Sequence, residues 1–192
     1  MEANLLLNEF AVQNGPNLWK VDLQSINLVQ GTTTYSIPST TIAILDVYRE
    51  TTDGSGNTTD IVLYPISRSE YSAIPDKQEQ APPTYFWFDR LINPTITLWP
   101  VPDGGGPYVL KYYRINQVQD ANVQGGQTLD IPYRFLDAFI SGLAARLARI
   151  YAPSLLMEAK AEATRTWALA SQQDQEFVPI FISPALGPYY RN

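Results

Sequence analysis

Residues 81–117, APPTYFWFDRLINPTITLWPVPDGGGPYVLKYYRINQ, carry the strongest β-sheet pattern in the chain. Three runs rich in aromatic and β-branched residues, at 84–89, 95–98 and 108–115, are separated by turn residues. Asn93-Pro94 divides the first two runs, and a Pro-Asp-Gly-Gly-Gly-Pro segment divides the last two. Such runs, bounded by Gly, Pro and Asn, indicate antiparallel strands. The stretch predicts a three-stranded meander with a glycine-rich hairpin turn.

The aromatic side chains of this stretch have two explanations. Tyr85 and Trp87 fall on one face of their strand and Phe86 and Phe88 on the other, because side chains alternate along a strand. Aromatic pairs across strands of a sandwich core are the ordinary explanation. Exposed Tyr85, Trp87 and Trp99 could instead stack on a sugar ring, so a carbohydrate-binding β-sandwich module stays open as the alternative function.

Further β-sheet signals precede this stretch. The runs 19–29 and 32–37 indicate short strands, and 42–49 with 61–64 indicate a hairpin with a long polar tip. The residues of that tip are Asp53, Gly54, Ser55, Gly56 and Asn57. Ser67 followed by Glu70 matches a capping box and predicts a short helix near 67–74.

The strongest helical pattern follows the β-sheet region. After Pro132, a residue suited to a first helical turn, apolar residues recur three and four positions apart along one face. They are Phe135, Phe139, Leu143, Leu147 and Ile150. Pro153 interrupts the pattern, and an alanine-rich helix is expected over 154–171, so the two form a helical hairpin. Residues 3–13 predict a short amphipathic helix at the N-terminal end of the sequence.

The segment 174–192 combines prolines with apolar residues too numerous for a solvated linker. We expect it to be an extended tail that finds shelter on another chain, with folding back on its own domain as the alternative. Its apolar residues are Phe177, Ile180, Phe181, Ile182, Leu186, Tyr189 and Tyr190.

These patterns together predict an α+β fold. A small α-helical bundle, made of the N-terminal helix and the C-terminal helical hairpin, carries an inserted antiparallel β-sandwich or barrel-like domain. The expected divisions are 1–16 for the first helix, 17–129 for the β domain, 130–173 for the hairpin and 174–192 for the tail. A chain of 192 residues can bury a sizeable core without disulfides or a metal.

The amino-acid composition excludes most kinds of catalytic site. The chain has no cysteine and no histidine, which excludes zinc sites built on these residues, Ser-His-Asp or Cys-His nucleophile systems, and histidine bases. Among the carboxylates, Asp103 falls in a turn, Asp130 near a helix start, and Asp137 three residues after Arg134, where the two could pair. An inverting hydrolase using Asp89 and Asp103 is a minor alternative. We predict no enzyme activity and no cofactor.

Charge and hydropathy limit the possible partners. The formal net charge is −6, and the 13 basic residues are scattered without a basic patch, so stable DNA binding is not expected. Neither a signal peptide nor a stretch of about 20 apolar residues is present. The sequence predicts assembly in a cytoplasm and no membrane contact.

The order of short motifs across residues 19–167 resembles the head-to-tail connector, or adaptor, proteins of tailed and especially short-tailed bacteriophages. The motifs in residues 81–117 are Pro-x-Tyr-x-x-Phe-Asp, Leu-Trp-Pro-x-Pro-Asp and Tyr-x-Leu-x-Tyr-Tyr-Arg. The residues that carry them are Pro83, Tyr85, Phe88, Asp89, Leu98, Trp99, Pro100, Pro102, Asp103, Tyr108, Leu110, Tyr112, Tyr113 and Arg114. Segments 66–71 and 129–136 fit the same pattern in the same order.

The resemblance implies a structural virion protein at the capsid–tail junction. Members assemble as a ring, typically of twelve copies, that binds the portal protein on one side and the tail nozzle on the other. DNA passes through the ring during ejection without specific binding, which suits an acidic chain. By the same resemblance the tail 174–192 docks into the portal, and the helices make the ring contacts, with Arg146, Arg149 and Trp167 as candidates. The meander and the hairpin tip 53–57 then face the tail of the phage.

Two features depart from that family pattern. Its members often begin with a longer helical region than residues 3–13, so the ring contacts made by that region are not expected to carry over to this chain. The second feature is the missing basic patch. The portal contact is therefore expected to rest on apolar packing and hydrogen bonds.

Overall fold

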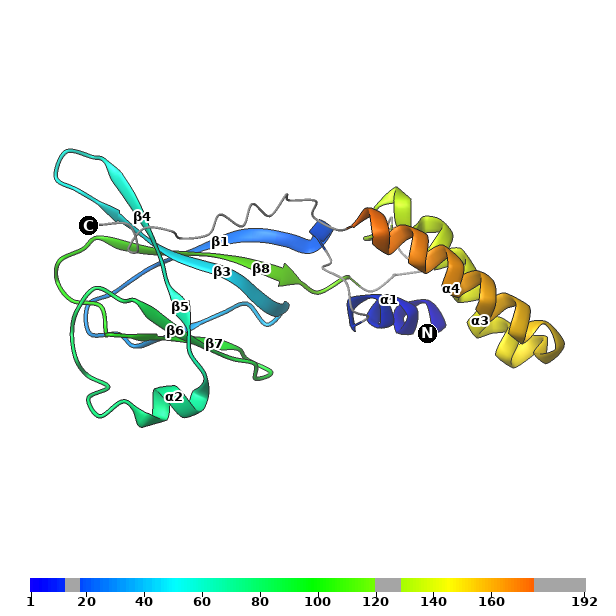
Figure 1. Ribbon diagram of the computed structural model, residues 1–192, viewed down its shortest axis with the longest axis horizontal. Helices are drawn as coiled ribbons and strands as arrows, with labels where there is room; N and C mark the ends of the chain where they lie inside the picture. The colour runs from blue at the N-terminus through cyan, green and yellow to red at the C-terminus, as the bar shows by residue number, and fades with distance from the viewer. Residues whose placement is uncertain (13–17, 120–128, 175–192) are drawn as a thin grey trace, which may run out of the picture.

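The computed structural model describes residues 1–12, 18–119 and 129–174 of the chain. The elements run, in order, α1 (Glu2–Val12), the 3₁₀ turn η1 (Leu18–Lys20), β1 (Val21–Asn27), β2 (Thr34–Ser36), β3 (Thr41–Thr52), β4 (Thr58–Val62), β5 (Tyr64–Pro65), α2 (Arg68–Ala73), β6 (Tyr85–Asp89), β7 (Thr95–Trp99), β8 (Tyr108–Asn116), η2 (Tyr133–Phe135), α3 (Leu136–Tyr151), η3 (Pro153–Leu155) and α4 (Leu156–Gln173). The predicted α+β fold with a C-terminal helical hairpin is confirmed. Figure 1 shows an elongated molecule with the strands at one end and α1, α3 and α4 at the other.

Two four-stranded sheets form the β part. The first has the order β1-β8-β3-β4 with antiparallel neighbours, and the second has the order β2-β7-β6-β5, in which only the short β5–β6 pair is parallel. Their inner faces share one core, to which Val47, Leu110 and Tyr112 come from the first sheet and Ile96 and Leu98 from the second. Sheet-on-sheet packing of this kind is the β-sandwich arrangement.

The predicted three-stranded meander is wrong in its third strand. β6 and β7 pair as expected, with Phe88 opposite Ile96, but β8 pairs with β1 and β3 in the other sheet. The glycine-rich segment after Pro102 is therefore a crossover between sheets and not a hairpin turn. Asp103 holds the crossover, because its Oδ1 accepts hydrogen bonds from the Gly105 amide at 2.9 Å and the Tyr108 hydroxyl at 2.8 Å.

β8 is a central strand, because it pairs with β1 on one edge and with β3 on the other. Its residues Tyr108, Leu110, Tyr112 and Arg114 point inward and are buried, as expected for a central strand flanked on both edges. Arg114 donates to both carboxylate oxygens of Asp22 on β1, from Nε at 2.8 Å and from Nη2 at 3.0 Å. This bidentate pair fixes the register of β1 against β8.

The other β predictions agree with the structure. β3 and β4 form the expected hairpin, with Thr52 opposite Thr58. Ser67 caps α2 through a capping box, in which the Glu70 amide donates to Ser67 Oγ at 3.1 Å and Glu70 Oε2 accepts from the Ser67 amide at 2.6 Å.

The helices enclose a second core. Leu6, Leu7 and Phe10 of α1 pack against Phe135 and Phe139 from the start of the C-terminal hairpin. The helix predicted from Pro132 begins as the 3₁₀ turn η2 and continues as α3, and the break at Pro153 takes the form of η3 before α4. In the described part of the chain, no helix is long and apolar enough to cross a membrane.

One predicted ion pair in this region is wrong. Arg134 does not pair with Asp137; its Nη2 donates to Oδ1 of Asp174 at 2.6 Å, just beyond α4. The spacing in the sequence favoured Asp137, three positions away. Arg134 lies in η2 instead, and its side chain reaches the end of α4.

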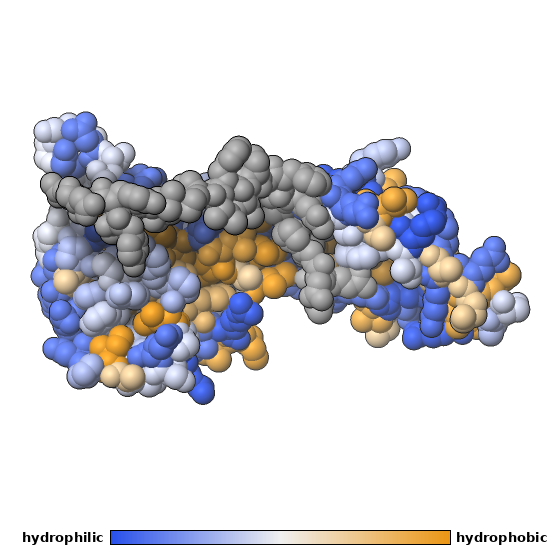
Figure 2. Space-filling model, in the orientation of Figure 1, coloured by the Kyte–Doolittle hydropathy of each residue, from blue (hydrophilic) through white to orange (hydrophobic). Residues whose placement is uncertain are grey.

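The two cores meet at the residues before β1. The Trp19 ring lies 4.5 Å from the Phe135 ring, measured between centroids, and Lys20 forms an ion pair with Asp130. Trp19, which lies in η1 directly before β1, thus packs into the helical core. On the face in Figure 2, apolar surface gathers near the middle of the molecule, while the tip of the β3–β4 hairpin is hydrophilic.

Candidate interaction site

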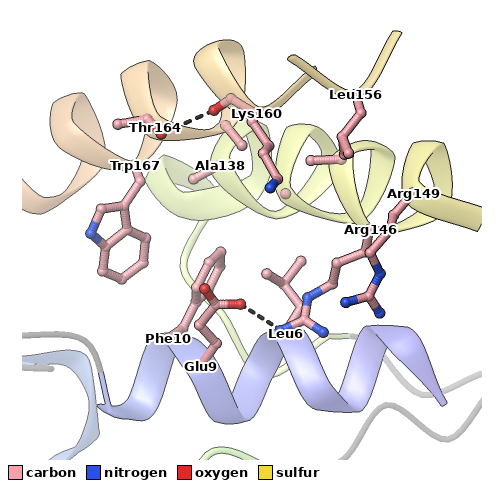
Figure 3. A pocket seen from close by; sticks show the side chains of 13 residues that line it. Leu6, Glu9, Phe10, Ala138, Arg146, Arg149, Leu156, Lys160, Thr164 and Trp167 are labelled. Carbon is pink, nitrogen blue, oxygen red and sulfur yellow. Dashed lines mark hydrogen bonds and ion pairs between the residues drawn. The ribbon is translucent and has the colours of Figure 1, made fainter. Parts of the chain in front are cut away.

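A groove of about 660 Å³ lies between α1 and α4, with α3 as its floor (Figure 3). Leu6 and Phe10 line it from α1 and Trp167 from α4. Ala138 and Gly142 on α3 form part of the floor. Because these floor residues are small, α3 leaves open the space that a larger side chain would fill.

The sequence sets this geometry through Gly142. A Cβ placed at Gly142 would lie 3.0 Å from Leu6 Cδ1 and 3.1 Å from Cδ2, tighter than ordinary van der Waals contact. Glycine therefore allows α1 to approach α3 closely at this point. At one end of the groove α1 also reaches α4, where the Phe10 and Trp167 ring centroids are 4.5 Å apart.

The three residues expected to make subunit contacts, Arg146, Arg149 and Trp167, all line this groove. Arg146 forms ion pairs with Glu9 and with Glu2, the latter at 3.4 Å, so it also holds α1 to α3. Trp167 is half-buried, and its ring also lies 5.6 Å from that of Phe135. Two of the three expected contact residues thus stabilise the bundle as well as lining the groove.

The groove rim carries free positive charge. Arg149 and Lys160 are exposed, and their side chains make no hydrogen bond or ion pair with any residue that the structure describes. Figure 3 shows both among the groove-lining side chains, from α3 and α4 respectively. With Arg146, they give the groove three cations against the single carboxylate of Glu9. A groove with apolar walls and an excess of cations suits an apolar segment that carries carboxylates.

Sequence reasoning missed Lys160, Leu6 and Phe10 as groove residues. Lys160 lies four positions after Leu156 and four before Thr164, and this i, i+4 spacing on one face of α4 was visible in the sequence. The position of α1 beside that face was not visible, because it depends on packing between distant segments.

The tip of the β3–β4 hairpin lies at the opposite end of the molecule (Figure 1). Asp53 Oδ1 accepts hydrogen bonds from the Ser55 amide at 2.8 Å and the Asn57 amide at 2.9 Å. These bonds, that from Asn57 first, hold the pKa of the Asp53 carboxyl below its usual value. Gly56 has a φ of 85°, which favours glycine. The predicted tail-side loop is thus an exposed tip with defined hydrogen bonding.

The seven apolar residues expected to dock into a portal lie outside the described residues. They are Phe177, Ile180, Phe181, Ile182, Leu186, Tyr189 and Tyr190. Their role stays a prediction.

The aromatic residues proposed for a sugar-binding platform already contact other groups. Trp87 stacks on Tyr71 with ring centroids 5.6 Å apart, and Tyr85 lies 5.8 Å from Trp99. The Trp99 indole N–H donates to the Asp76 carbonyl at 3.0 Å. The ring faces and the polar handle that a sugar would use are therefore partly occupied by the protein itself.

Two of the four carboxylates considered for catalysis, Asp103 and Asp130, have structural partners. Hydrogen bonds from the Gly105 amide and then the Tyr108 hydroxyl hold the pKa of Asp103 below its usual value. Asp130 pairs with Lys20 and accepts a hydrogen bond from the Gln119 amide at 3.1 Å. No group of three or more metal-binding side chains occurs within residues 1–12, 18–119 and 129–174.

The chain is elongated, with the groove at one end and the hydrogen-bonded hairpin tip at the other. No curated protein matches the sequence. The family model for the SU10 adaptor protein matches residues 3–179. The chain therefore belongs to the SU10 adaptor protein family and is a structural adaptor of a bacteriophage.

Proposed function

We propose that the chain is one copy of a virion ring that joins the capsid portal to the tail. The observation that carries the proposal is the family match over residues 3–179, which includes both the β-sandwich and the helical part. The elongated shape supports it, because a chain with separate contact surfaces at its two ends can bridge two partners. The ring is assembled in the cytoplasm of the bacterial host and remains at the capsid–tail junction.

In the proposed ring, three parts of the chain each contact a different partner. The helical groove, through Arg146, Arg149 and Trp167, contacts neighbouring copies in a ring of twelve. The tail 174–192 docks into the portal, and the β3–β4 tip at 53–57 faces the tail nozzle. Apolar residues in the tail supply the portal contact, since the sequence has no basic patch for it.

The ring encloses a channel for DNA. A net charge of −6 for each copy disfavours stable contacts with a polyanion, so DNA passes without being held. The role requires neither catalysis nor a cofactor.

Carbohydrate binding is the weaker proposal. It needs exposed faces on Tyr85, Trp87 and Trp99, but Trp87 stacks on Tyr71 and Trp99 donates its indole N–H within the chain. The family match supports the adaptor role instead.

Portal binding by the tail tests the proposed function. The full chain and a variant that stops at residue 174 are each mixed with the portal protein of the same phage, and binding is followed by sedimentation. The full chain is expected to co-sediment with the portal ring, and the shortened chain is expected to lose this binding. A full chain that does not bind the portal would refute the adaptor role, whereas equal binding by both would refute only the role of the tail.

A further inference from the structure

The back of the helical hairpin carries an apolar ridge. Four residues of α3, spaced by three or four positions, share one face: Ile140, Ala144, Leu147 and Tyr151. Ile140 is 58% exposed, Leu147 39% and Tyr151 80%. Apolar side chains repeated at this spacing are usually the buried stripe of a helix. Here the stripe lies on the surface of the single chain.

The ridge and the groove lie on opposite sides of the hairpin. Gly142, Arg146 and Arg149 each follow a ridge residue by two positions, and two positions correspond to about 200° around an α-helix. α4 repeats the arrangement. Its groove residues Lys160 and Trp167 are followed, two positions later, by the exposed Glu162 and Leu169.

The two sides also carry opposite charge. Asp137, one turn before Ile140, and Glu158 and Glu162 of α4 are exposed on the ridge side. Arg165 pairs with Glu162 at 2.6 Å, which leaves three carboxylates against one cation. The groove has the reverse balance, with Arg146, Arg149 and Lys160 against Glu9.

We propose that the ridge of one copy, centred on Ile140 and Leu147, fills the groove of the next copy. The apolar stripe then covers the partly exposed Leu156, Ala163 and Trp167 of α4. Leu6 and Phe10, each only 3% exposed, form the base beneath them. Arg149 and Lys160 meet the carboxylates beside the ridge. A helix that lays an apolar stripe into a groove is a common mode of recognition. Charges of opposite sign on the two surfaces favour this pairing over ridge-to-ridge or groove-to-groove contact.

Such a contact is heterologous, because each copy offers two different surfaces. Heterologous contacts repeat head to tail and close into a ring when the rotation between copies permits. The inference deepens the proposed function, on which it rests, by naming the two surfaces that form the ring.

Single-cysteine variants test the contact directly, since the chain has no cysteine of its own. Leu147→Cys places a thiol on the ridge, and Thr164→Cys places one on the groove lining, both at positions that are not buried. A short bismaleimide is added to each variant alone and to their equimolar mixture. The protein concentration is about 1 mM, so that even a weak contact with a Kd of about 1 mM is populated. Ser69→Cys, on exposed α2, replaces Leu147→Cys in the control mixture.

The head-to-tail contact predicts a cross-linked dimer in the mixture of Leu147→Cys with Thr164→Cys and no dimer in either variant alone. Ile140→Cys is expected to substitute for Leu147→Cys, and the control mixture is expected to give no dimer. Adding Arg149→Glu and Lys160→Glu to the groove variant is expected to abolish the dimer. A dimer of Leu147→Cys alone would show ridge-to-ridge contact and overturn the proposal, as would a mixture without a dimer for both ridge positions.

The same variants separate this inference from the proposed function. If rings form on the portal but the mixture does not cross-link within them, the adaptor role stands and the ridge-in-groove contact is wrong. If the mixture cross-links but the chain ignores the portal, the contact is right and the adaptor role is wrong.

Discussion

Single residues in this protein stabilise the fold through contacts between distant segments. Arg114 illustrates the point, because its side chain is 8% exposed while that of its partner Asp22 is 40% exposed. Its Nη1 also donates to Thr41 Oγ1 at 2.9 Å. Loss of the arginine would leave a carboxylate that water can reach, whereas loss of the carboxylate charge would leave a buried cation without its counter-ion.

Asp22→Asn is therefore expected to lower the free energy of unfolding by about 2 kcal/mol, less than for a fully buried pair because Asp22 is partly exposed. Urea denaturation followed by tryptophan fluorescence measures the change. Asp46→Asn, at an exposed position of β3, is the matched control and should stay within about 0.5 kcal/mol of the parent. Equal effects of the two changes would show that the Arg114 pair is not a stabilising contact.

The same pair predicts a pH dependence. Hydrogen bonding to Arg114 is the main cause that lowers the pKa of Asp22 from its model-compound value of 3.8. Because the folded pKa is lower than the unfolded one, the stabilisation is complete above pH 3.8 and is lost as the pH falls through the folded pKa. Unfolding experiments from pH 5 to pH 2 should show the parent losing more stability than Asp22→Asn. Parallel curves would contradict this origin of the pH dependence.

At the scale of elements, local patterns predicted helices and strands well. The capping box of α2, the first half of the α3 stripe and the break at Pro153 each depend on residues within a few positions of one another. The second half of the predicted stripe is wrong as a core face, because Leu147 and Ile150 are exposed. Assignment of β8 to its sheet was not predictable in this way. A glycine-rich loop can close a hairpin or cross between sheets, and the choice depends on pairing with β1, some 90 positions away.

The candidate site shows the same contrast between local sequence patterns and packing of distant segments. Arg146, Arg149 and Trp167 were predicted as contact residues through the family resemblance, and that role stays a prediction. Their meeting in one groove depends on α1 docking beside α4. The Arg134–Asp137 prediction failed because the actual partner, Asp174, is 40 positions away.

Docking of α1 is expected to depend on Gly142. Gly142→Ile adds a branched side chain where even a Cβ would lie 3.0 Å from Leu6, so it should displace α1 and cost about 1–3 kcal/mol. Hydrogen exchange is expected to rise in residues 2–12. Ala161→Ile, on the exposed side of α4, is the control and should leave exchange in α1 unchanged. Unchanged protection of α1 in Gly142→Ile would contradict the packing described for this helix.

For the whole molecule, the two cores suggest two units joined at Trp19. We propose that the units correspond to 17–129 for the β-sandwich and to 1–16 with 130–173 for the helices.

Truncations in the two cores test this division. Phe135→Ala removes a ring that is 1% exposed, at an expected cost of about 3–5 kcal/mol, and should speed hydrogen exchange in 136–173 while 85–116 stays protected. Leu110→Ala, at a position with 0% exposure, should show the reverse. If both truncations released both regions together, the chain would be one cooperative unit.

The proposed ring of this chain on the portal is tested most directly by the mass of the assembled complex. Native mass spectrometry of the portal ring saturated with the full chain should show a single complex in which twelve copies of the chain are added. Its mass should not change when further chain is supplied. A portal ring that gains no copies, or only a variable few that increase with concentration, would contradict the claim.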